Sequence, residues 1–152
     1  MPQKKQIKIR RMTAEDVPAV AEIERESFSQ PWSEKAYLDT VSDKNALYLV
    51  AEREGGGLAG MCGLFDLQGE GDISNVAVAK DFRGQKIGET MLRELLRQGN
   101  ERGIASFTLE VRASNEVAIH LYEKLGFISE GRRKNFYERP KEDALILWKR
   151  KD

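Results

Sequence analysis

The sequence predicts a mixed α/β domain in which a mostly antiparallel sheet is flanked by helices. Segments of alternating apolar residues and segments of helical spacing follow one another in the order βααβββαβαββ. One connection is glycine-rich and marks an antiparallel hairpin, whereas the strand-helix-strand unit at 73–111 requires a right-handed crossover between parallel strands. A chain of 152 residues suits one hydrophobic core, so we treat 1–152 as a single domain.

The chain opens with a strand and a helix. Residues 7–11 alternate as a short strand. Thr13 and Asp16 have the spacing of a capping box, which opens a helix expected to run to about Phe28. The apolar stripe expected on this helix consists of Val17, Val20, Ala21 and Phe28.

A second helix and a hairpin follow. Ser33 is the expected N-cap of the helix, and Trp32 is placed to pack against Tyr37 at its start. Glycines at 55–57 allow the positive φ that a hairpin turn needs. The strands on either side of this turn are Ala46–Arg53 and Leu58–Leu67.

The second half alternates strands and helices. Alternating patterns predict strands at 73–79, 104–111, 127–137 and 144–149. Helical spacing predicts helices at 87–102 and 115–125. Gly103 and Gly126 follow these helices, where glycine commonly ends a helix.

Composition narrows the function classes. The chain has 25 basic and 25 acidic residues, so it lacks the net positive field that non-specific nucleic-acid binding requires. It has no apolar run that would suit a signal peptide or a membrane span, so we expect a cytoplasmic protein without a nucleic-acid or membrane partner. One cysteine, Cys62, and one histidine, His120, leave too few soft ligands for a zinc site, so we expect no metal.

A candidate phosphate-binding loop joins the strand at 73–79 to the next helix. Gly84 and Gly88 let phosphates approach backbone N–H groups at the positive end of the helix, and Arg83 and Lys86 add charge. Two glycines at a helix start also fit plain turn chemistry. Glu110 lies where a dinucleotide fold places its ribose-binding acid, which keeps that class as a rival, although the glycine fingerprint is missing.

Several strings together resemble the GNAT N-acetyltransferase family, and within it the enzymes that act on ribosomal-protein alanine. They cover the whole chain in order: 31–35, 75–78, 83–88, 109–115, 118–122, 126–127 and 142–144. The resemblance implies a sheet whose two central parallel strands begin side by side and splay apart, with the arm of acetyl-CoA entering between them. Lys86 departs from the family pattern, which usually has glycine at this position of the loop.

The resemblance also implies the site residues. Glu110 is the general base, Tyr122 the general acid, and the N–H near Val78 polarises the thioester carbonyl. Acetyl-CoA contacts are expected from three places: the strand backbone at Val76, Ala77 and Val78, the loop residues Arg83, Gly84, Gln85, Lys86, Ile87, Gly88 and Glu89, and the helix residue Asn115. Strand alternation independently turns the Glu110 side chain away from Leu109 and Val111.

The expected acceptor is a protein N-terminus. An α-amine of pKa ~7.8 costs about 3.5 kcal/mol less to deprotonate than a lysine of pKa ~10.4. The resemblance points to the N-terminal alanine of the eighteenth small-subunit ribosomal protein, attacked directly in a ternary complex. Trp32 and Tyr137 are hypothesised to contact the peptide, with simple packing as the alternative for each.

Alternatives to this assignment stay open at this point. The chain could acetylate another N-terminus, a lysine or a small amine, or it could be an inactive acyl-CoA-binding regulator. We expect a monomer or a weak homodimer.

Overall fold

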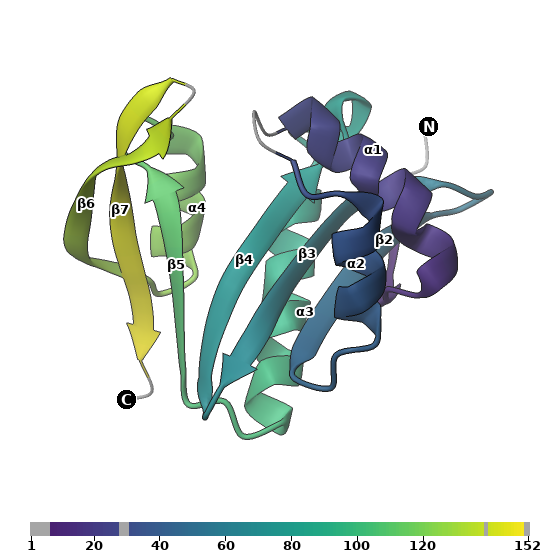
Figure 1. Cartoon of the computed structure of the whole chain (residues 1–152), viewed down its shortest axis with the longest axis horizontal. Helices are drawn as coiled ribbons and strands as arrows, with labels where there is room; N and C mark the ends of the chain where they lie inside the picture. The colour runs from purple at the N-terminus through teal and green to yellow at the C-terminus, as the bar shows by residue number, and fades with distance from the viewer. Residues whose placement is uncertain (1–6, 28–30, 139, 151–152) are drawn as a thin grey trace, which may run out of the picture.

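The computed structural model describes residues 7–27, 31–138 and 140–150, and it contains one seven-stranded sheet. Its strand order is β1-β2-β3-β4-β5-β7-β6, and every neighbouring pair is antiparallel except β4 and β5 (Figure 1). The strands are β1 (Ile7–Arg11), β2 (Ala46–Arg53), β3 (Leu58–Leu67), β4 (Glu70–Val78), β5 (Ser106–Arg112), β6 (Ile128–Glu138) and β7 (Lys141–Arg150). The predicted fold class is confirmed.

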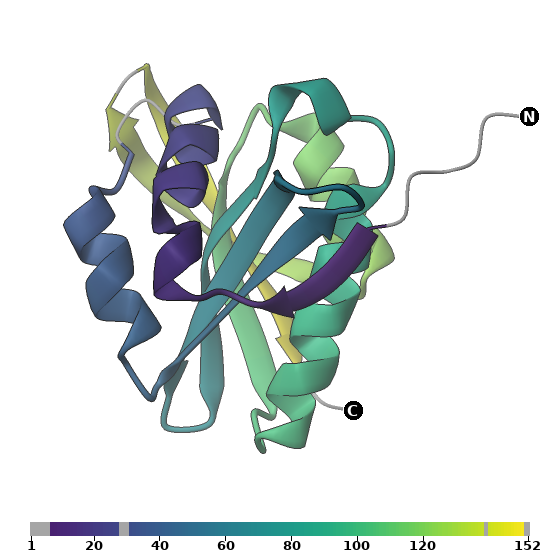
Figure 2. The same cartoon turned by 90° about the vertical axis from the view of Figure 1, so that its right-hand side faces the viewer.

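Helices cover both faces of the sheet (Figure 2). One face carries α1 (Val17–Ser27), which follows the 3-10 turn η1 (Ala14–Asp16), and α2 (Glu34–Val41). The other face carries α3 (Ile87–Glu101), preceded by the 3-10 turn η2 (Lys80–Phe82), and α4 (Glu116–Lys124). None of the helices in the described ranges is long and apolar enough to cross a bilayer.

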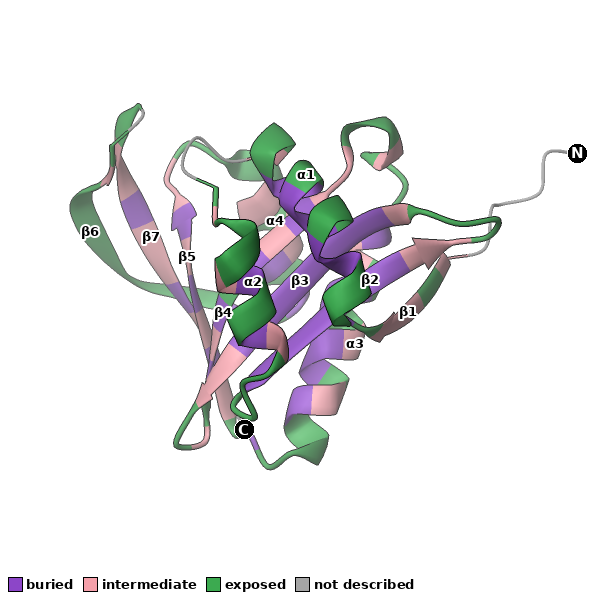
Figure 3. Cartoon of the chain, turned by 45° about the vertical axis from the view of Figure 1, so that its right-hand side comes forward, coloured by how far each residue is buried: buried purple, intermediate pink, exposed green. Residues whose placement is uncertain are grey.

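Each face has its own hydrophobic core. Under α3 and α4, the core contains Leu92, Leu95, Phe107 and Tyr122. Under α1 and α2, it contains Val20, Tyr37, Tyr48 and Met61. The strands β2 and β3, covered on both faces, are buried along most of their length, whereas the edge strand β6 is exposed (Figure 3).

The two parallel strands meet at one end and then diverge (Figure 1). Their pairing comprises only Glu70–Asp72 of β4 against Ser106–Thr108 of β5. Gly71 allows this close approach, because a Cβ there would lie 2.9 Å from the Phe107 ring. Just beyond, the register between β3 and β4 shifts by one residue, and such a bulge bends a strand and increases its twist. The expected splay is thereby confirmed.

Some predicted boundaries were wrong. The strand expected at 73–79 begins at Glu70, because Gln68 and Gly69 both adopt positive φ, 56° and 92°, and form a two-residue hairpin turn. The strand expected from 144 begins at Lys141, in register with Glu138 of β6. The strand expected from 104 begins at Ser106. The expected helix end at Phe28 lies outside the described residues.

Candidate active site

Glu110 occupies the face of β5 opposite the α3–α4 core. Along β5 the side chains of Phe107, Leu109 and Val111 are buried, and Glu110 alternates with them. Its carboxyl group lines a hollow of about 250 Å³ where β4, β5, β6 and β7 come together. The hollow is lined by Leu67, Glu70, Asp72, Thr108, Leu109, Glu110, Arg133, Ile146 and Trp148.

The Glu110 carboxyl group experiences opposing electrostatic influences. Burial raises its pKa, the positive charge of Arg133 lowers it, and the negative charge of Asp72 raises it. Arg133 Nε lies 3.0 Å from Glu110 Oε2. The N–H is not aimed at the oxygen, and this buried oxygen accepts no hydrogen bond from any described residue. A carboxylate oxygen with this geometry is suited to accept a proton from an incoming donor.

Tyr122 lies on the opposite face of the sheet from Glu110, in the core under α3 and α4. It lies on α4, its side chain is buried, and its ring meets Phe127 edge-on with centroids 5.8 Å apart. Burial raises its pKa, so the phenol holds its proton at neutral pH. Tyr137 of β6 interacts electrostatically with both Glu110 and Tyr122. Burial and the negative charge of Glu110 raise the pKa of Tyr137, and Tyr137 adds to the effect of burial in raising the pKa of Tyr122.

The loop before α3 has the backbone geometry of an anion site. Gly84 has φ 82° and open space where a Cβ would lie, and Lys86, the N-cap, has φ 63°. Thr90 N is the first amide of α3 to donate to the protein, 3.1 Å from Lys86 O. The earlier amides, 85–89, donate to no described residue, so they fit a pyrophosphate at the positive helix end.

Side chains of the same loop serve other contacts. Arg83 donates to Val78 O and Ser27 Oγ, both at 3.2 Å, and so ties the loop to β4 and α1. Glu89 pairs with Lys124 Nζ at 2.9 Å and thereby joins α3 to α4. Among the phosphate-binding candidates, the backbone amides are therefore available, whereas these two side chains are committed to the fold.

The β4 backbone beyond the parallel pair offers the expected hydrogen-bonding edge. Val76, Ala77 and Val78 pair with β3 on one side, and β5 does not pair with them on the other. Asn115 is the N-cap of α4 and accepts a hydrogen bond from Ala118 N at 3.2 Å.

The sequence and the fold of this chain are similar to those of known acetyltransferases. Residues 17–127 match the model of the Acetyltransferase (GNAT) family. A Bacillus subtilis relative is 40% identical over 141 residues, which is 92% of this chain and 93% of the relative. The chain belongs to the GNAT acetyltransferase family. It is an N-acetyltransferase that takes its acetyl group from acetyl-CoA.

Two further comparisons give the relationship within GNAT enzymes. The [ribosomal protein bS18]-alanine N-acetyltransferase of Escherichia coli is 34% identical over 134 residues, covering 87% of this chain and 89% of that protein. The Bacillus subtilis relative is provisionally assigned the same activity. The crystal structure of the Escherichia coli enzyme superposes with a TM-score of 0.87 at 33% identity, covering 95% of this chain and 94% of that one.

Trp32 and Tyr137, the two hypothesised peptide contacts, are both partly exposed aromatic residues. The Trp32 ring packs on Tyr37 at 5.2 Å, as expected, and on Phe65 at 6.3 Å. Tyr137 is covered by the Arg112 guanidinium, 4.3 Å from its ring centroid. Each ring therefore packs against neighbouring side chains and remains partly exposed.

A buried polar network beside Trp32 was not predicted. Glu24 of α1 is 2% exposed and accepts hydrogen bonds from Tyr37 OH, Trp32 N at 3.2 Å and Asn75 Nδ2 at 3.4 Å. Asn75 Oδ1 accepts in turn from Tyr48 OH. A signal was present, since Glu24 falls on the apolar stripe of α1 and Asn75 on an otherwise apolar strand.

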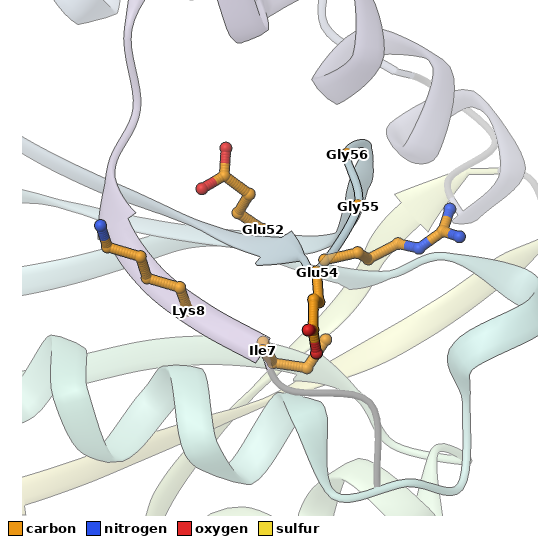
Figure 4. Close-up of a pocket in the computed structure, with 7 residues that line it drawn as sticks. Ile7, Lys8, Glu52, Glu54, Gly55 and Gly56 are labelled. Carbon is orange, nitrogen blue, oxygen red and sulfur yellow. The ribbon is translucent and has the colours of Figure 1, made fainter. Parts of the chain in front are cut away.

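A larger hollow, of about 440 Å³, is shown in Figure 4. It is bounded by β1 and the β2–β3 hairpin, with Lys8, Glu52 and Glu54 at its rim. It contains no predicted site residue. The described residues also contain no group of three side chains able to hold a metal ion.

Proposed function

We propose that this GNAT enzyme acetylates the N-terminal alanine of ribosomal protein bS18, with Glu110 as general base and Tyr122 as general acid. The acceptor assignment rests on the relatives at 34–40% identity, which extend over nearly the whole chain. The observation that carries the residue roles is the position of Glu110, a half-buried carboxylate beside the point where β4 and β5 diverge.

The proposed reaction moves two protons from the acceptor nitrogen. Glu110 takes one from the ammonium, and the freed lone pair forms the N–C bond to the thioester carbon while the carbonyl electrons move to oxygen. Collapse restores the carbonyl and breaks the C–S bond, as the Tyr122 phenol protonates the departing sulfur. The phenolate then regains a proton from the new amide nitrogen, and Glu110 releases its own to water. Atoms and charges balance without a covalent enzyme intermediate.

Backbone groups would hold acetyl-CoA in place. The edge of β4 at 76–78, which does not pair with β5, would bind the pantetheine arm, and the amides at 85–89 would bind the pyrophosphate. Asn115, already a cap, has its amide nitrogen left to donate. Trp32 and Tyr137 would bound the peptide on either side of the base.

Mass-resolved acetylation of peptides tests the acceptor. The enzyme is given acetyl-CoA and a hexapeptide starting Ala-Arg-Tyr, beside the same peptide with a blocked N-terminus and an added internal lysine. We expect a single acetyl group on the free α-amine. Modification of the lysine alone would refute the α-amine assignment, and tight acetyl-CoA binding without transfer would instead support a regulatory protein.

We further propose that the chain functions in the cytoplasm as one domain, as a monomer or weak homodimer. Light scattering on an eluting size-exclusion peak should give a mass near 17.3 kDa at low micromolar concentration. A stable mass of twice that value would contradict this.

A further inference from the structure

Arg133 contacts the proposed base from a strand that carries no other predicted catalytic group. Its side chain extends from β6, is 59% exposed, and places Nε 3.0 Å from Glu110 Oε2. Its guanidinium carbon lies 5.5 Å from the centre of the Phe136 ring. The guanidinium thus lies at the carboxylate to which the acceptor ammonium must give its proton.

The other charged groups around Glu110 are acidic or turned elsewhere. From β4, Asp72 and Glu70 line the same hollow, and β7 contributes only Ile146 and Trp148. Tyr137 of β6 is near and neutral. On β5 itself, Arg112 stacks on Tyr137 and pairs with Glu142 at 3.3 Å. Among the described residues that line the hollow, Arg133 is the one cation opposite three carboxylates.

We propose that Arg133 is a positioning residue that occupies the place of the acceptor ammonium, pairs with the Glu110 carboxylate and favours its ionised form in the free enzyme, and withdraws when the acceptor binds. The inference rests on the proposed role of Glu110. One cation replaces another in this exchange, so the acidic hollow is never left with less compensating charge.

The ion pair between Arg133 and Glu110 is weak. An exposed ion pair is worth only about 0–1 kcal/mol, and this one lacks an aligned hydrogen bond. The neighbouring Arg132 differs, because its partner Asp143 is hydrogen-bonded at 2.9 Å and also accepts from Asn135 N. Arg132 lies outside the hollow, so Arg132→Ala removes the same charge from the same strand and is the matched control.

Arg133→Ala should have two kinetic effects in the full-length enzyme. The KM for the alanine peptide should fall by about two- to fivefold, the factor corresponding to an exposed ion pair, because no internal cation competes for the site. The acidic limb of kcat/KM should move to higher pH, because the carboxylate loses its positive neighbour. Arg133→Lys, which retains the charge, should keep the limb near its wild-type position, and Arg132→Ala should change neither quantity.

A carbon-13 NMR titration of the Glu110 carboxyl group provides a readout without turnover. It should move to higher pH in Arg133→Ala and not in Arg132→Ala. Equal titrations in these two variants, or a raised KM in Arg133→Ala, would overturn the inference even if the wild-type enzyme acetylates the peptide. If wild-type transfer itself fails, the proposed function is wrong, and the NMR comparison still decides whether Arg133 sets the ionisation of Glu110.

Discussion

Replacing Glu24 by alanine should destabilise the packing of α1 against α2 and β4. Glu24 accepts hydrogen bonds from Tyr37 OH, Asn75 Nδ2 and Trp32 N. Tyr37 is fully buried and Asn75 is 4% exposed, and each buried donor without an acceptor costs about 1–3 kcal/mol. Loss of the carboxylate also relieves its own desolvation. We therefore expect a net loss of about 2–4 kcal/mol, or roughly 5–15 °C in Tm for a domain of this size.

Thermal unfolding followed by circular dichroism measures this loss. Glu22→Ala is the matched control, since Glu22 lies on the same helix with a side chain 66% exposed, and its removal should cost less than about 0.5 kcal/mol. Emission from Trp32 should also shift to the red in Glu24→Ala, as the loop loses its tie to α1. If Glu24→Ala melted within about 2 °C of Glu22→Ala, the network would not have the role argued here.

The burial of Glu24 also makes the stability of the fold depend on pH. Burial raises the pKa of Glu24, so the folded state holds this proton more tightly than the unfolded chain does. The resulting stabilisation is complete below the ordinary carboxyl pKa and is lost as the pH rises through the raised value. The Tm of wild type relative to Glu24→Gln should fall over that range, and a constant difference would contradict the argument.

Three further predictions concern the proposed catalytic residues and the loop before α3. Glu110→Gln should slow transfer by about 10²–10⁴-fold and abolish the acidic limb of kcat/KM, with acetyl-CoA affinity unchanged by calorimetry; full turnover across pH would exclude Glu110 as the base. Tyr122→Phe should lower kcat with little change in acetyl-CoA affinity, and a loss confined to affinity would indicate a binding role instead. Lys86→Gly should raise the free energy of unfolding by about 1 kcal/mol in denaturant titrations, because lysine adopts φ 63° there; a destabilised variant would mean that the side chain compensates for the strain.

Residue periodicity predicted strand boundaries well where turn residues in the sequence mark the end of the strand. The hairpin strands Ala46–Arg53 and Leu58–Leu67 were predicted to the residue, because three glycines mark the turn between them. The start of β4 was missed because Gln68 resembles an ordinary strand residue. Only the pairing of Leu67 with Glu70 places Gln68 in a turn, where it adopts positive φ. The charged start of β7 was missed because Glu142 and Asp143 interrupt the apolar alternation, yet both are paired across strands with Arg112 and Arg132.

For the site, the order of motifs predicted Glu110, Tyr122 and the loop at 83–88, and strand alternation predicted that the Glu110 side chain points away from the core, as the structure shows. These properties are local, because period two and a helix start are set within a few residues. The partners of Glu110 are not local: Asp72 comes from β4 and Arg133 from β6, and their meeting depends on register, bulge and strand order. The sequence by itself determined which residues could do acid–base chemistry, and only the tertiary structure decided which charges surround them, because a carboxylate's pKa depends on burial and neighbours brought from distant strands.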